Sequence, residues 1–165
     1  MGNYFCHMSK PDSEGFSISN GGTSVFIAVL CLAGHEIAIT GWQKELLAWI
    51  STHDRHVIGN GNTGFDVSDM GWHTDRYQEQ KQFLLLLTAR ARLKTNWEKL
   101  SYAPAIERAL YALDKFDALV NGFERKYCLN TELEWHIEPS RPLLRCFIHD
   151  IFIHSEGCVI CNDEL

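Results

Sequence analysis

The sequence predicts a mainly α-helical domain with a small β element near its N-terminus, followed by a short C-terminal β-hairpin. Apolar residues recur at three and four spacing in several stretches between residues 40 and 123, which indicates amphipathic helices. Turn residues separate these stretches, and the helical period stops after Lys126. We therefore place a boundary between a helical domain, residues 1–127, and a C-terminal tail, residues 128–165.

The composition is that of an ordinary globular protein, with 45% hydrophobic and 22% charged residues in a chain of 165. A chain of this length can bury a core without disulfides. Its formal net charge is −6, and no run of five or six like charges occurs, so we expect no general affinity for nucleic acid. An acidic surface instead favours a protein partner that is basic.

The N-terminal residues lack the basic and apolar regions of a signal peptide, which predicts a cytoplasmic protein. The longest apolar run, residues 25–33, is about half as long as a bilayer crossing requires, so we expect no membrane association. In a reducing compartment, the six cysteines favour metal binding over disulfides.

The elements of the first half follow from local patterns. Residues 16–19 alternate between apolar and polar, which predicts a short strand or hairpin. Residues 25–33 are a buried helix capped by Thr23 or Ser24, or else a buried strand, and Gly34 ends them in either case. A helix from Thr40 is predicted by five residues that share one face: Trp42, Leu46, Trp49, Ile50 and His53.

A glycine-rich loop, residues 59–71, separates this helix from two longer ones. The first is predicted from Thr74 to Leu100, and its middle, residues 84–87, is apolar nearly all round. The second begins at Pro104 and keeps helical spacing as far as Phe123. Because residues 101–103 form a short connection, we expect the two helices to pack antiparallel.

The end of the chain carries the strongest chemical signal. Cys146 with His149, and Cys158 with Cys161, form two ligand pairs, each separated by two residues, as in a zinc knuckle. The residues between the pairs can form a strand and return, with Gly157 turning the backbone before Cys158. We predict a zinc ion bound by these four residues, and it is structural because all four positions are filled by protein.

Several alternatives stay open at this site. In one, the cysteines are free thiols and the histidine is unrelated to them. In another, the cysteines form a disulfide or a redox pair. In a third, His154 competes for a place as a metal ligand. The redox alternative is disfavoured because only residues 162–165 follow Cys161, which leaves no helix to lower the pKa of a thiol. Cys128 and His136 are candidates for a second site.

The motifs CFIH and CVIC, residues 146–161, resemble the zinc ribbons, a family of small metal-pinned β-hairpins that serve as docking or nucleic-acid-contacting modules. The nucleic-acid-binding members are usually basic. Here Asp150 and Glu156 lie between the two ligand pairs, and no Lys or Arg does. The resemblance therefore implies protein contact or stabilisation as the role of the tail.

The remaining candidates are weaker. Four residues beside the glycine-rich loop are candidates for an acid–base site, although turns and helix caps explain most of them: Asp66, Asp69, His73 and Asp75. The motif HDRH, residues 53–56, is interpreted as solvated histidines at a helix end. Trp72 is either an interface anchor or a core residue.

These observations support three hypotheses, and the oligomeric state stays open. In the first, the chain is a small intracellular acidic protein-binding module and not an enzyme. In size, acidity and lack of catalytic groups it resembles the immunity proteins of bacterial toxin systems, which neutralise a toxin by direct binding. The second is a zinc-ribbon adaptor or regulator in nucleic-acid metabolism. The third is an enzyme with a site near Asp66 to Asp75.

Overall fold

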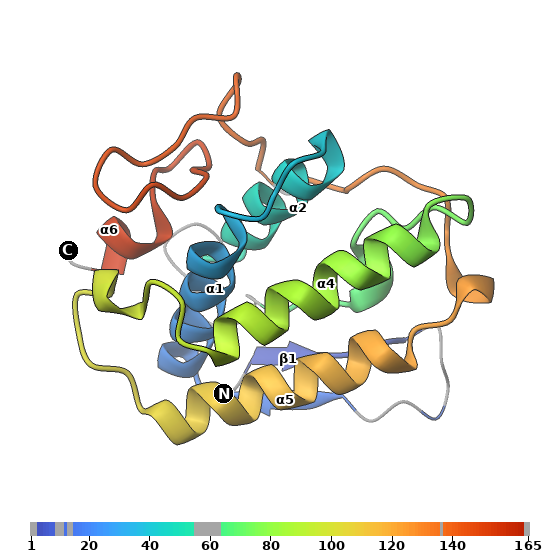
Figure 1. Cartoon of the computed structure of the whole chain (residues 1–165), viewed down its shortest axis with the longest axis horizontal. Coiled ribbons are helices and arrows are strands. Elements are labelled where there is room, and N and C mark those ends of the chain that lie inside the picture. Colours follow the sequence, from blue (N-terminus) through green and yellow to red (C-terminus); the bar gives the residue numbers. More distant parts are fainter. Residues whose placement is uncertain (1–2, 9–11, 13–14, 55–63, 136, 164–165) are drawn as a thin grey trace.

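The computed structural model describes residues 3–8, 12, 15–54, 64–135 and 137–163. The fold is mainly α-helical, as predicted, and its helices gather around the buried helix α1 (Asn20–Gly34), as Figure 1 shows. Helix α1 packs against the other described α-helices, which are α2 (Gly41–Ser51), α4 (Tyr77–Arg92), α5 (Ile106–Gly122) and α6 (Val159–Asp163). No helix in these described ranges has the length and hydropathy of a membrane span.

Residues 25–33 are helical, which resolves the choice between helix and strand. Helix α1 begins earlier than predicted, because the side chain of Ser19 accepts a hydrogen bond from the backbone N–H of Gly22 and caps the helix. Thr23 and Ser24 were predicted as caps, but they lie inside the helix and donate their hydroxyls to backbone carbonyls one turn earlier. Helix α1 ends at Gly34, as predicted.

The predicted β element is an antiparallel pair, β1 (Asn3–Phe5) and β2 (Phe16–Ile18). Phe5 pairs with Phe16, and their rings stack with centroids 5.0 Å apart. Phe5 also packs edge-on against Phe26 of α1, with ring centroids 5.1 Å apart. This aromatic contact fixes the N-terminal segment on the central helix.

Helix α2 begins where the sequence predicts. Thr40 is its N-cap, and Gln43 completes a capping box, because its side chain accepts the backbone N–H of Thr40. The predicted apolar face is buried at Leu46, Trp49 and Ile50.

Helix α4 is shorter than the predicted span from Thr74 to Leu100. Lys94 and Asn96 adopt left-handed backbone conformations, with φ near 60°, and end the helical run. The side chain of Asn96 then donates to the carbonyl of Leu32 in the last turn of α1. The 3₁₀ helix η2 (Trp97–Lys99) follows, so residues 93–105 connect α4 to α5, a longer connection than predicted.

Helices α4 and α5 nevertheless lie side by side and run antiparallel, as predicted (Figure 1). Helix α5 begins two residues after Pro104, at Ile106. The apolar middle of α4 is buried at Leu84 and Leu87, whereas Leu86 is exposed. One side of that middle therefore faces solvent.

The C-terminal tail has little regular structure apart from α6. Two isolated antiparallel bridges, Arg145 with Phe152 and Pro139 with His154, replace the continuous strands of the predicted hairpin. The chain turns at Gly157, with φ of +107°, and then enters α6. The second ligand pair therefore lies at the start of a short helix rather than in a hairpin.

Candidate metal centre

The structure brings together the four residues that the sequence selects as metal ligands. The ligand atoms of Cys146, His149, Cys158 and Cys161 all lie within 4.8 Å of one another. His149 Nδ1 lies 3.6 Å, 3.6 Å and 3.3 Å from the sulfur atoms of Cys146, Cys158 and Cys161. This is the only group of three or more such ligand atoms within the described part of the chain.

The other candidate ligands lie either apart from this cluster or outside the described residues. His154 is not in the cluster, and its Nδ1 accepts the backbone N–H of Glu156 at 3.1 Å. Cys128 is not in the cluster either, and His136 lies outside the described residues.

The first ligand pair is held by a tight turn between the two arms of the tail. The backbone N–H of Cys146 donates to the carbonyl of Ile151 at 2.8 Å, and the N–H of Asp150 donates back to the Cys146 carbonyl at 2.9 Å. Asp150 closes this turn in a left-handed conformation, with φ of 55°. The turn directs the side chains of Cys146 and His149 toward one point.

The second ligand pair is placed by the turn that precedes it. His154 and Gly157 exchange backbone hydrogen bonds, of 3.1 Å and 3.0 Å, and Cys158 follows directly. Cys158 directly precedes α6 and Cys161 lies within it, so the first turn of this helix brings the two thiols to the same side. The sequence analysis expected no helix at this motif, but a short one, residues 159–163, begins within it.

The thiols of the cluster differ in their environment. Burial raises the pKa of Cys158, and the neighbouring Cys146 adds to this effect. Burial also acts to raise the pKa of Cys146, but hydrogen bonds from the backbone amides of His149 and Ile148 outweigh it and lower that pKa. Of these two thiols, Cys146 is therefore the more readily deprotonated for a metal ion.

This donor set fits a metal ion well. Three thiols and one imidazole are soft and borderline ligands, and four of them can surround a tetrahedral ion. His149 and Cys158 are buried, while Cys146 and Cys161 are half-buried at the edge of the site. With every position filled by protein, such a centre stabilises structure and leaves no place for a reacting water.

The tail is fastened to the end of α2 by a buried polar cluster that the sequence did not predict. His154 Nε2 lies 3.6 Å from Asp54 Oδ2, and Asn162 donates to the same oxygen at 3.1 Å. The interpretation of the HDRH motif as solvated is wrong for His53 and Asp54, which are both buried, while residues 55 and 56 lie outside the described ranges. His53 Nδ1 contacts the carbonyl of Trp49 at 2.9 Å.

A second feature is a hollow of about 310 Å³ beside β1 and the C-terminal end of α2, which we call the acidic hollow. Three carboxylates from two distant segments line it: Asp66, Asp69 and Glu134. Tyr4 and Met8, which are 54% and 78% exposed, also line it and leave apolar surface open to solvent. The hollow therefore combines a cavity, exposed apolar groups and negative charge.

The four acid–base candidates do not meet at one place. Only Asp66 and Asp69 line the acidic hollow. His73 Nε2 lies 3.7 Å from Glu132, and Asp75 lines a separate depression beside Arg125. The four acid–base candidates therefore lie at three separate places in the structure.

Asp66 caps a helix, which is one of the two roles that the sequence suggests for it. Its carboxylate accepts the backbone N–H groups of Ser68 at 2.8 Å and Met8 at 3.0 Å, which caps the 3₁₀ helix η1 (Val67–Asp69). Gly64 lets this segment approach β1, because a Cβ atom there would lie 1.9 Å from the carbonyl oxygen of Tyr4.

Cys6, at the wall of the hollow, is not an activated nucleophile. Burial raises its pKa to about 11, and the carboxylates of Asp66 and Asp69 add to the shift. The thiol therefore stays protonated at neutral pH. The part of the shift that comes from Asp66 and Asp69 reflects the negative potential of these carboxylates at the wall of the hollow.

Trp72 is a core residue rather than an interface anchor. It has no exposed surface, and its ring stacks on Phe123 with centroids 4.3 Å apart. Its Nε1–H donates to the carbonyl of Val67 at 2.7 Å. Its position near the glycine-rich loop had left both roles open in the sequence.

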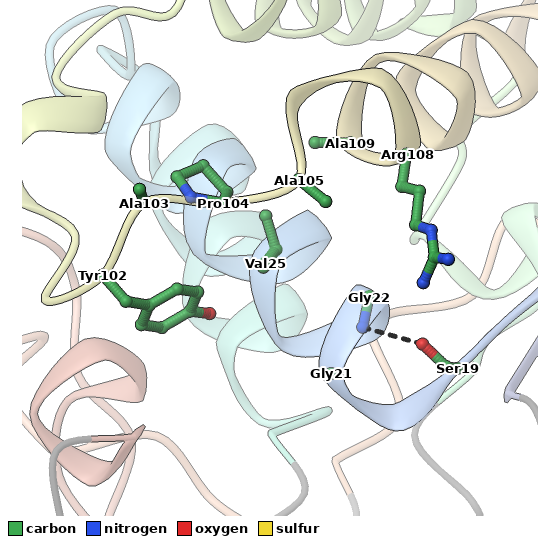
Figure 2. Close-up of a pocket in the computed structure, with 10 residues that line it drawn as sticks. All are labelled: Ser19, Gly21, Gly22, Val25, Tyr102, Ala103, Pro104, Ala105, Arg108 and Ala109. Carbon is green, nitrogen blue, oxygen red and sulfur yellow. Dashed lines mark hydrogen bonds between the residues drawn. The ribbon is translucent and has the colours of Figure 1, made fainter.

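Figure 2 shows a further hollow, of about 280 Å³, between the N-terminal turn of α1 and the segment that leads into α5. Ser19, Gly22, Tyr102 and Arg108 are among its lining residues, and the capping bond from Gly22 to Ser19 lies at its edge. None of the residues predicted for a site lines it.

Comparisons with protein-family models, with curated proteins and with solved structures find no match to this chain.

Proposed function

We propose that this chain is a zinc-stabilised binding module for a basic protein partner. The observation that carries the proposal is the acidic hollow, in which three carboxylates and two exposed apolar side chains surround a cavity of about 310 Å³. A lysine or arginine side chain fits such a surface in two ways. Its aliphatic stem packs against Tyr4 and Met8, and its cation meets the carboxylates.

Zinc is the metal that this donor set favours. Thiolate ligands select against magnesium and calcium, and a site of three thiolates and one imidazole is common among structural zinc centres. The zinc holds the tail, and the tail supplies Glu134 to the hollow. The zinc site and the acidic hollow therefore share the tail as a common part.

Charge supports a basic partner over an acidic one. The chain carries 21 acidic and 15 basic residues, so the field of the whole molecule repels an acidic partner and attracts a basic one. A toxin neutralised by an immunity protein is one class of partner that would fit. Binding without catalysis agrees with the raised pKa of Cys6.

The test is affinity purification from the protein's own cell with three forms of the chain. The wild type should capture a basic protein. The double variant Asp69→Asn with Glu134→Gln should capture at least ~10-fold less, because it removes two of the three charges. The matched control, Glu98→Gln with Glu107→Gln, removes two charges outside the hollow and should capture as much as the wild type. Equal capture by both double variants would refute the proposal.

A further inference from the structure

The acidic hollow and the metal centre lie on either side of the C-terminal end of α2. Trp49 and His53 line the hollow. The next residue, Asp54, accepts a hydrogen bond from Asn162, which directly follows the metal-ligand candidate Cys161. Two neighbouring residues, His53 and Asp54, therefore belong one to each site.

The tail also shapes the hollow from its other side. The indole N–H of Trp49 donates to the backbone carbonyl of Glu134 at 2.8 Å, which places this residue beside the hollow. The docked tail thus contributes both a wall of the hollow and two of the partners of Asp54.

The contact between the tail and the end of α2 involves buried groups. The side chains of Asp54 and His154 have no exposed surface, so a change in the partners of Asp54 is costly. If the metal leaves and its ligands separate, His154 and Asn162 lose their fixed positions. The loss of these two contacts leaves the segment that follows α2 less firmly held.

We propose that the metal ion fixes the shape of the acidic hollow, through Asp54 at the end of α2 and through Glu134 in the tail. One consequence is that partner binding depends on the metal ion, and this consequence rests on the proposed function. By thermodynamic linkage, a partner bound in the hollow must also tighten the retention of metal.

The test uses Cys6 as a reporter inside the hollow and Cys31 as a reporter in the core of α1, where it is buried. The rate of alkylation of each thiol is measured by peptide mapping, on the zinc-loaded chain and after removal of zinc by a chelator under reducing conditions. We expect the alkylation rate of Cys6 to rise at least ~10-fold on zinc removal while that of Cys31 stays low. An equal rise at both thiols, or none at Cys6, overturns the proposal.

A variant separates the coupling from loss of the metal itself. Asp54→Ala should keep one zinc per chain and still show faster alkylation of Cys6, because the side chain that contacts His154 and Asn162 is removed while the metal ligands remain. The control Asp75→Ala, at an exposed position, should match the wild type. Zinc-loaded Asp54→Ala with wild-type rates at Cys6 would contradict a link through Asp54.

A fluorescent hexa-arginine peptide then tests the proposed function separately. We expect it to bind the zinc-loaded chain and to bind at least ~10-fold more weakly without zinc, with recovery when zinc is returned. Failure to bind the zinc-loaded chain counts against the proposed function, and the alkylation of Cys6 then decides the coupling. Equal peptide affinity with and without zinc overturns the coupling and leaves the proposed function standing.

Discussion

The imidazole Nε2 of His154 lies 3.6 Å from the carboxylate of Asp54, and neither side chain has exposed surface. His154 Nδ1 accepts the backbone N–H of Glu156, so that nitrogen carries no proton and Nε2 carries it instead. The proton on Nε2 therefore faces the carboxylate. This contact joins residues 100 positions apart and fastens the tail to the helical core.

Replacing Asp54 by alanine should lower the free energy of unfolding by about 3–5 kcal/mol, since it removes the carboxylate that faces the buried His154 and one of the two acceptors of Asn162. Denaturant unfolding of the zinc-loaded protein measures the change. Asp75→Ala, at an exposed position, should stay within about 0.5 kcal/mol of the wild type. Similar losses for the two variants would argue against a buried pair.

Trp72→Ala should destabilise the fold by about 3–5 kcal/mol, because it removes a fully buried ring stacked on Phe123. Phe147 is the matched aromatic control, since it is fully exposed in the turn between two ligand candidates. Phe147→Ala should change stability by less than about 0.5 kcal/mol. If thermal unfolding ranks the two variants in the opposite order, Trp72 is not in the core.

Gly64→Ala should destabilise by at least about 1–3 kcal/mol, because the new methyl group would lie 1.9 Å from the carbonyl oxygen of Tyr4. Gly41, the first residue of α2, serves as the control, because a methyl group added there would meet no atom within 4 Å. Gly41→Ala should be neutral or stabilising by up to about 1 kcal/mol. Equal stability of the two variants would show that residues 64 and 4 do not approach closely.

Alkaline pH should weaken the fold through Cys31. Burial raises the pKa of this thiol from 9.0 to about 12, so the folded state holds its proton more tightly than the unfolded state. The resulting stability is fully present below pH 9 and declines as the pH rises from about 9 toward about 12. Unfolding curves at about pH 8, 9.5 and 11 should show a smaller decline for Cys31→Ala than for the wild type. Identical declines would contradict a buried thiol.

Local patterns predicted the metal-ligand cluster and most helices because the relevant contacts are close in sequence. Cys146 with His149, and Cys158 with Cys161, are three residues apart, so one turn decides their geometry. The Thr40 cap of α2 was equally local. The start of α1 at Ser19 and the end of α4 before Lys94 were missed, since alternative caps and left-handed residues leave weak signals.

The acidic hollow and the Asp54 cluster could not be predicted, because each depends on segments that only tertiary packing brings together. Asp66 and Asp69 were selected from the sequence, but nothing in the sequence pairs them with Glu134 or with Tyr4. His154 was considered only as a competing metal ligand. Its partner Asp54 lay in a motif that is typical of a solvated helix end.

The measurement that tests the central claim most directly is the metal content of the chain purified without added zinc, by native mass spectrometry and elemental analysis. We predict close to one zinc per chain for the wild type, and loss of that zinc with a destabilised tail for Cys158→Ser. A wild-type chain that contains no metal and is as stable as the zinc-loaded form would contradict the account.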